Sequence, residues 1–191
     1  MATDSLTALG LGTEEPHPQP MHRPPRSQNE RLMNLPLALR AYLFLGLIEA
    51  VAAMAAFFFV LKGAGWIYGQ RLTPSDPLYL SATTACLSAI IVMQSINVFL
   101  CRSSVEPAFT RRIFNNPLIL WGVALELVSL LLINYTPWGN LLLETAAVPV
   151  ELWLFLLPFA AGMIGLEELR KWFVRRSLRA RSTIGGLRPS S

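Results

Sequence analysis

Long apolar segments separated by short polar ones divide this chain. The apolar segments cover residues 41–61, 79–101, 118–135 and 150–166, and none alternates between apolar and polar positions with a period of two. A helix of about 20 apolar residues can cross a hydrocarbon layer roughly 30 Å thick, and it satisfies its own backbone hydrogen bonds there. The pattern therefore predicts an all-α fold, an integral membrane helical bundle with four transmembrane helices.

The composition agrees with this prediction. Hydrophobic residues make up 53% of the 191 residues and charged residues only 15%, and the mean hydropathy is +0.44. A soluble domain usually carries about 25% charged residues. We therefore expect the lipid bilayer to be the main environment of the chain.

The distribution of Lys and Arg predicts the orientation in the membrane. Of the 16 basic residues, 14 lie before the first apolar segment, between the second and third, or after the fourth. Cytoplasmic loops carry an excess of Lys and Arg. We therefore expect both termini and the middle loop in the cytoplasm, in a multi-pass protein of the plasma or inner membrane. The net charge of +4 follows from this topology, and no basic stretch with interleaved aromatic residues predicts a nucleic-acid partner.

Two polar segments flank the expected transmembrane domain, which covers residues 38–176. Residues 12–37 begin with five prolines in 14 positions and are predicted to form a Pro-rich cytoplasmic connector. Residues 177–191 have no core-forming pattern and are predicted to form a disordered, basic cytoplasmic tail. Cys86 and Cys101 would lie about 22 Å apart on one helix, too far for a disulfide.

A few polar side chains interrupt the apolar segments. Gln94 and Asn97 are three residues apart and share a helix face, whereas Glu126 and Glu49 are isolated carboxyl groups. An ionised carboxylate in the bilayer centre costs about 2.5–3.5 kcal/mol, so these groups should face the bundle interior. Two interpretations stay open for Gln94, Asn97 and Glu126. They form hydrogen bonds between helices, or they supply hard oxygen ligands to Na⁺, K⁺, Ca²⁺ or H⁺. For Glu49 we expect a structural role.

The order of several motifs resembles the C-terminal membrane region of type II P-type cation-transporting ATPases. Thr3-Asp4 resembles the Thr-Asp of the sixth transmembrane helix of that family, and MHRPPR resembles the connector after it. The four apolar segments then resemble the seventh to tenth helices. The segments MQSINVFLCRS, WGVALELVSLLLINYTP and GLEELRKWFVRR resemble parts of the eighth, ninth and tenth. The resemblance extends from Thr3 to Arg176.

The resemblance implies a set of ligands for a transported cation, namely Asp4, Gln94, Asn97 and Glu126. It favours Ca²⁺ as the transported ion and leaves Na⁺, K⁺ and H⁺ open. It also implies that residues 1–11 are the remnant of a transmembrane helix. Eleven helical residues are about 16 Å long and cannot span a bilayer, so we expect the chain to be a truncated part of a longer pump.

The sequence lacks the parts of this family that handle ATP. The phosphorylated Asp-Lys-Thr-Gly-Thr motif, the nucleotide-binding and actuator domains and the first five helices are absent. We therefore expect no catalytic residues and no cofactor in this chain, while Mg²⁺ and ATP would be used by the missing domains. The predicted function is that of the C-terminal transmembrane domain of a cation pump, inactive alone, with the transported cation and the remainder of the pump on another chain as partners.

Two alternatives remain open on the sequence. The chain could be a stand-alone four-helix membrane protein that acts as a structural partner or regulator of a transporter. It could also form a small channel, in which several copies assemble a pore from the face that carries Gln94 and Asn97.

Overall fold

The computed structural model describes residues 2–13, 35–102 and 116–185. Within these ranges, the side chains of residues 2–6, 36, 37 and 178–185 lie outside the described part. The described residues form helices joined by turns and contain no strand, which confirms the all-α prediction.

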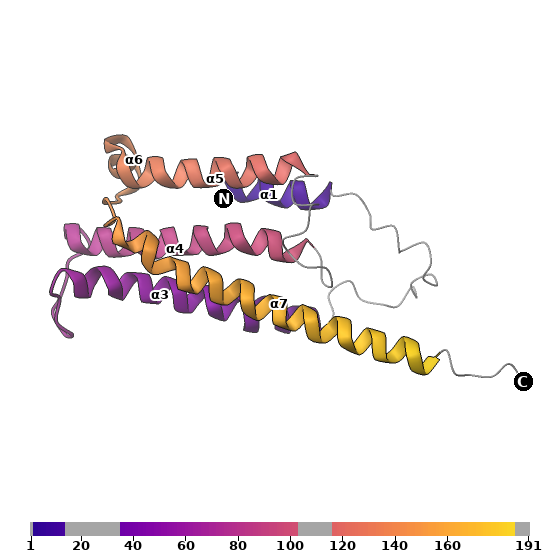
Figure 1. Ribbon diagram of the computed structural model, residues 1–191. Coiled ribbons are helices and arrows are strands. Elements are labelled where there is room, and N and C mark those ends of the chain that lie inside the picture. The colour runs from indigo at the N-terminus through magenta and orange to yellow at the C-terminus, as the bar shows by residue number, and fades with distance from the viewer. Residues whose placement is uncertain (1, 14–34, 103–115, 186–191) are drawn as a thin grey trace, which may run out of the picture.

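Figure 1 shows the order of the helices along the chain. In chain order they are α1 (Ala2–Gly12), α2 (Leu35–Ala38), the π-helix η2 (Leu39–Leu45), α3 (Gly46–Gly63), α4 (Pro77–Cys101), α5 (Pro117–Tyr135), α6 (Pro137–Leu143) and α7 (Glu151–Gly185).

Four helical stretches are long and apolar enough to cross a membrane, which confirms the predicted number of transmembrane helices. They cover residues 39–63, 77–101, 117–135 and 151–177. The first of them is built from η2 and α3, which follow one another without a break. The chain is therefore an integral membrane protein.

Three of the helices begin with the same local signal, a capping residue followed by proline. The side-chain oxygens of Asp76, Asn116 and Thr136 accept hydrogen bonds from backbone N–H groups two or three residues later, at 2.8–3.1 Å. The proline that follows each of them occupies the first turn, where its missing N–H group costs nothing. These dipeptides set the starts of α4, α5 and α6.

The structure differs from the sequence prediction outside the apolar segments. Helix α6 lies within a stretch for which the apolar pattern predicts only a connection between spans. Helix α7 continues to Gly185, although a tail without regular structure was expected from residue 177. The Arg-, Leu- and Ala-containing sequence after residue 177 has good intrinsic helix propensity, which explains the continuation. Most of the predicted connector, residues 14–34, and the end of the tail, residues 186–191, lie outside the described residues.

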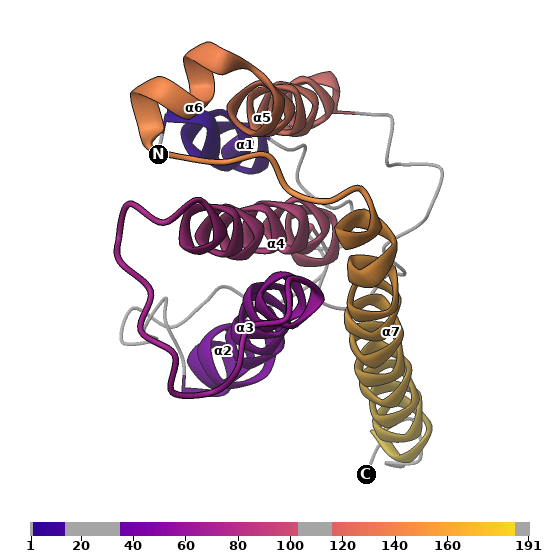
Figure 2. The ribbon, with the colours of Figure 1, turned by 90° about the vertical axis from the view of Figure 1, so that its left-hand side faces the viewer.

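Helix α4 is the central element of the bundle. It packs against α3, α5 and α7, and α1 lies along α5 (Figures 1 and 2). In the view along the helices, α5 with α1 forms one side of α4, while α3 and α7 lie on the other (Figure 2).

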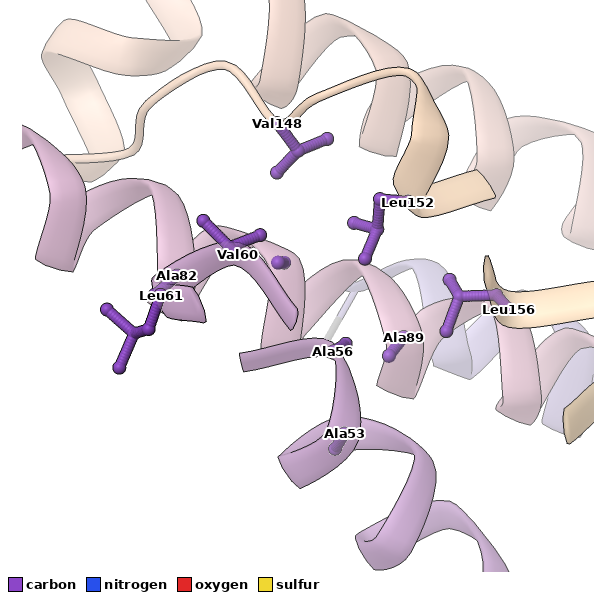
Figure 3. Close-up of a cluster of buried hydrophobic side chains, with 10 residues drawn as sticks. Ala53, Ala56, Val60, Leu61, Ala82, Ala89, Val148, Leu152 and Leu156 are labelled. Atoms are coloured by element: carbon purple, nitrogen blue, oxygen red, sulfur yellow. The ribbon is translucent and has the colours of Figure 1, made fainter. Parts of the chain in front are cut away.

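Small residues form the contact between α3 and α4. Ala53 and Ala56 of α3 are buried together with Ala82, Ala85 and Ala89 of α4. The end of this contact is closed by larger side chains from the segment before α7 and from α7 itself, which are Val148, Leu152 and Leu156 (Figure 3). Lipid tails are as apolar as the helices, so association depends on close backbone approach and dispersion contacts, which small residues permit.

This packing predicts that Ala56→Leu separates α3 from α4. Ala56 is fully buried, whereas the neighbouring Ala55 lines an open groove between α3 and α7. We expect Ala56→Leu to destabilise the bundle by about 1–3 kcal/mol, as overpacking does in other cores. Thermal unfolding in detergent, followed by circular dichroism, measures the effect. Ala55→Leu is the matched control, and an equal loss of stability in both variants would show that this contact is not tightly packed.

Candidate functional site

Two pairs of polar side chains join α4 to α5 inside the bundle. The Nδ2 group of Asn134 donates a hydrogen bond to Oγ of Ser88 at 3.0 Å, and both residues are fully buried. The hydroxyl of Ser95 donates to Oε2 of Glu126 at 3.3 Å, and Glu126 is only 3% exposed. The serines are seven residues apart and their partners are eight apart, so each pair of positions lies on one helix face. The two helices are thus aligned by polar contacts about two turns apart.

A pocket of about 270 Å³ opens between α1, α4 and α5 beside this contact. It brings together Gln94, Asn97 and Glu126, three of the four residues predicted as ligands. The other residues that line it are Thr7, Ala8, Leu11, Val98 and Cys101. Gln94 is exposed, whereas Glu126 lines the pocket although it is buried. The pocket therefore combines amide and carboxylate oxygens on a largely apolar background.

Asn97 also connects α4 to α3. Its Nδ2 group donates to Oε1 of Glu49 at 3.3 Å, and its Oδ1 atom accepts from Sγ of Cys101 at 3.3 Å. The bond to Glu49 is what the helix-to-helix interpretation of Asn97 predicts, whereas Cys101 lies on the same helix. This bond also gives Glu49 the structural contact expected for it. Asn97 thus has a structural role whether or not it also binds an ion.

The fourth predicted ligand, Asp4, lies in α1. Its side chain falls outside the described part of the structure, so its role as a ligand stays a prediction. Thr7 lies three residues later, is 5% exposed and lines the pocket. The sequence analysis did not single out Thr7 or Ser95. Thr7 lies three residues after Asp4 and shares its helix face, which is the signal that could have found it. Ser95 directly follows Gln94 and points to another side of the helix, so this spacing does not mark it.

Helix α1 forms one wall of the pocket because it is attached to the start of α5. The Nδ2 group of Asn116 donates to the backbone oxygen of Gly10 at 2.8 Å, while its Oδ1 atom caps α5. The two helices also approach closely at Gly10, where a Cβ atom would lie 2.8 Å from Cγ1 of Ile119. Only glycine fits at this contact without a shift of one helix.

The donor set of the pocket suits a hard cation. Amide and carboxylate oxygens are the ligands of Na⁺, K⁺ and Ca²⁺ and not of soft metals. Within residues 2–13, 35–102 and 116–185, no three His, Cys, Asp or Glu side chains are grouped as a metal site would require. The described pocket offers a single carboxylate, that of Glu126.

A second polar cluster, which the sequence analysis missed, lies between η2 and α7. Glu167 is fully buried, and its Oε1 atom lies 2.5 Å from Nη2 of Arg40 and 2.7 Å from Nη2 of Arg170. Nε of Arg170 also donates to Oε2 of Glu167 at 2.9 Å. One carboxylate therefore pairs with two guanidinium groups. The alternation of acidic and basic residues in GLEELRKW was a visible signal, but it does not reveal Arg40 as the distant partner.

Lys171 extends this cluster to α4. It is fully buried, and its Nζ donates to the backbone oxygen of Leu100 at 3.1 Å, close to the end of α4 at Cys101. A cation at this position satisfies a terminal carbonyl and interacts favourably with the helix dipole. Nζ of Lys171 also lies 3.9 Å from Oε1 of Glu168. Helices η2, α4 and α7 are thus joined at one end of the bundle.

Fold and pocket together define a multi-span helical membrane domain with amide and carboxyl side chains in a pocket between its helices. The sequence profile described as "Cation transporting ATPase, C-terminus" matches residues 1–173. The chain therefore belongs to the family of cation-transporting ATPases, of which it represents the C-terminal membrane region.

Several relatives are P-type ATPase alpha chains. The potassium-transporting ATPase alpha chain 2 of Homo sapiens is 26% identical over 200 aligned positions, which cover 92% of this chain and 19% of that protein. The sodium/potassium-transporting ATPase subunit alpha of Drosophila melanogaster is 25% identical over 202 positions, covering 93% of this chain and 19% of that protein. For subunit alpha-2 of Rattus norvegicus the identity is 24% over 201 positions, with 92% and 20% covered. The chain thus spans about a fifth of the length of these relatives.

These matches confirm the resemblance to the C-terminal membrane region of P-type cation-transporting ATPases. They also give information on which cation the relatives transport. The names of these relatives refer to potassium or to sodium and potassium. The expectation of Ca²⁺ stays a prediction that these relatives do not specifically support.

The contact between Asn116 and Gly10 predicts the effect of Asn116→Asp on α1. An aspartate keeps the oxygen that caps α5 but cannot donate to the oxygen of Gly10. We expect the free energy that holds α1 against α5 to fall by about 1–2 kcal/mol. The protection of the α1 amides against hydrogen exchange should then fall about 5- to 30-fold, while the start of α5 stays protected. Hydrogen exchange in nanodiscs with mass-spectrometric detection measures both. Equal protection of α1 in the variant and the wild type would contradict the proposed attachment.

The Glu167 cluster predicts that Glu167→Gln is strongly destabilising. Without the carboxylate, the Arg40 and Arg170 guanidinium groups lose their shared counter-charge, and breaking a buried ion pair costs about 3–5 kcal/mol. Because Arg170 is 27% exposed, we expect the lower part of that range. Glu151→Gln, at an exposed position in the first turn of the same helix, is the matched control and should cost less than about 1 kcal/mol. Denaturant unfolding in mixed micelles compares the two, and similar losses would contradict a special role of Glu167.

Proposed function

We propose that this chain works as the transport-site part of an ATP-driven cation pump, with the pocket between α1, α4 and α5 as part of the ion path. The observation that carries the proposal is the convergence of Gln94, Asn97 and Glu126 on one pocket. These residues come from two helices, α4 and α5. A purely structural set of polar residues has no need of a shared pocket.

The roles of the three residues differ. Gln94 is exposed to the pocket and offers its amide oxygen directly. Glu126 provides the negative charge, and Ser95 orients its carboxylate through a hydrogen bond to Oε2. Asn97 is tied to Glu49 and contributes chiefly to the shape of the pocket. Asp4 of α1 would complete the ligand set by resemblance to the family.

We propose a monovalent cation, Na⁺ or K⁺, as the substrate. Sites for Ca²⁺ commonly use several carboxylates, whereas the described part of this pocket has one carboxylate and two neutral amides. With Asp4 included, the proposed set would hold two carboxylates and two neutral amides, a charge compatible with monovalent ions as well as with Ca²⁺. The names of the potassium- and sodium/potassium-transporting relatives support the choice of a monovalent ion.

The remaining parts of the pump lie outside this chain. Phosphoryl transfer needs a nucleophilic carboxylate, a phosphate cradle and Mg²⁺, and we propose that ATP and Mg²⁺ are used by domains on the remainder of the pump. The excess of basic residues supports a cytoplasmic position for both ends and for the connection between α4 and α5, in a plasma or inner membrane.

The size of the native product tests whether the chain acts within a pump. An antibody against residues 177–191 should detect a membrane protein several-fold heavier than 21.2 kDa, or a 21.2 kDa chain that co-purifies with a subunit able to bind ATP. A 21.2 kDa product that purifies without such a subunit would contradict the pump and support the stand-alone structural or regulatory protein.

Ion-dependent phosphorylation of the native pump tests the site. We expect Gln94→Leu and Glu126→Gln each to raise the half-activating Na⁺ or K⁺ concentration at least about tenfold, which corresponds to about 1.4 kcal/mol. Gln70→Leu and Glu144→Gln, at exposed positions outside the pocket, are the matched controls and should leave it unchanged. If the two site variants leave every ion response unchanged, the pocket is not the site. If they shift a Ca²⁺ response and no Na⁺ or K⁺ response, the site is retained and the choice of a monovalent ion is wrong.

A further inference from the structure

The short helix α6 lies beside the last turn of α5 (Figures 1 and 2). The hydroxyl of Thr136 caps its start, only one residue after the end of α5. At Gly139 the two helices approach so closely that a Cβ atom would lie 2.6 Å from the backbone oxygen of Leu132. After α6, the hydroxyl of Thr145 donates a hydrogen bond to the backbone oxygen of Ile133 at 3.1 Å. These contacts hold α6 at the depth of the last turn of a membrane span.

The polarity of α6 is the reverse of that expected for a helix in water. Its large apolar side chains point outward, since Trp138 is 76%, Leu141 77% and Leu142 75% exposed. Its one polar side chain, that of Asn140, is half-buried, and its Oδ1 atom accepts a hydrogen bond from the hydroxyl of Thr145 at 3.2 Å. The sequence of α6, PWGNLLL, contains no charged residue. The helix therefore presents an apolar surface where a helix in water would present a polar one.

The apolar surface of α6 continues the exposed apolar surface of α5. On α5, exposed side chains spaced by four and three positions form one stripe along the helix, and they are Trp121, Leu125, Val128, Leu132 and Tyr135. Because α5 is a membrane span, hydrocarbon is the environment that suits this stripe. The stripe ends in the turn against which α6 packs, so the surfaces of α5 and α6 form one apolar face.

Aromatic side chains mark the level of α6 on the other spans. The end of α3, the start of α4, the end of α5 and the start of α7 meet at the same end of the bundle as α6 (Figure 1). Each of these places carries Trp or Tyr, and the residues are Trp66, Tyr68, Tyr79, Tyr135 and Trp153. Indole and phenol rings favour the boundary between hydrocarbon and lipid headgroups. Helix α6 with its Trp138 therefore lies at the level of an aromatic belt.

We propose that α6 is an interfacial helix whose apolar face is immersed in the lipid leaflet at this end of the bundle. The indole of Trp138 lies at the boundary with the headgroups, and Leu141 and Leu142 contact the upper part of the acyl chains. Because α6 carries no charge, its partner is the bilayer surface and not a lipid with a particular headgroup. The contacts of Gly139 and Thr145 with the last turn of α5 make α6 an anchor that fixes how deeply α5 sits. This role does not depend on the proposed ion pocket.

Electron paramagnetic resonance of spin-labelled protein tests this proposal. The native membrane assembly that contains the full chain is purified and reconstituted in phosphatidylcholine vesicles, with Cys86→Ala and Cys101→Ser as the label-free background. Leu142→Cys carries the label on α6. Val128→Cys is the reference for lipid on α5, and Ser75→Cys, which is exposed in the connection between α3 and α4, is the reference for water. We expect the label at position 142 to collide with oxygen in preference to a water-soluble nickel chelate, at a depth of about 5–10 Å below the phosphate groups.

Two outcomes would overturn the proposal. A label at position 142 that is as open to the nickel chelate as the label of Ser75→Cys would place α6 in water. A label that neither oxygen nor the chelate reaches would show that protein covers this face, and would assign it to a partner chain or to another part of the pump. Leu141→Cys is a second labelling site on the same face, and the proposal requires the same response from it. Unchanged circular dichroism of each labelled variant shows that the label has not unfolded the helices.

Discussion

The arrangement of the spans that contain η2, α4 and α7 depends on the ion pairs of the buried Glu167 carboxylate and on the hydrogen bond of the nearby Lys171. This carboxylate pairs with Arg40 of η2 and Arg170 of α7, and one residue later than Arg170, Lys171 reaches the last turn of α4. Charges away from water are costly unless they are paired, so these partners leave little freedom in how far each helix is inserted. The relative heights of η2, α4 and α7 are thereby set at one end of the bundle.

Each contact along the rest of the bundle is individually weaker than the Glu167 ion pairs, and most of these contacts involve α4. On one side, α4 presents alanines to α3 and allows close approach of the backbones. On the other side, its serines meet Glu126 and Asn134 of α5. A helix that is apolar on average can therefore have two distinct faces, and α3 and α5 are held against α4 by different kinds of contact.

The proposed ion pocket shares residues with this framework. Asn97 and Glu126 both join helices and both line the pocket, so their positions are fixed by the contacts that hold α4 against α3 and α5. The third wall, α1, is attached through Asn116, the residue that also caps α5. A site built on such a framework keeps its ligands in place without an ion, which is the preorganisation that selective binding requires.

The sequence by itself determined the fold class and the number of spans, because a helix in hydrocarbon must satisfy its own backbone and its apolar length is visible in the chain. The dipeptides that begin with Asp76, Asn116 and Thr136 mark the starts of α4, α5 and α6, a local signal that the apolar pattern did not use. Only the tertiary structure decided which polar groups meet, such as Arg40 and Glu167, which are 127 positions apart. Such pairings depend on how each helix is rotated and how deeply it sits against its neighbours. Apolar periodicity is weak in a helix that is apolar all round, so it does not encode that rotation.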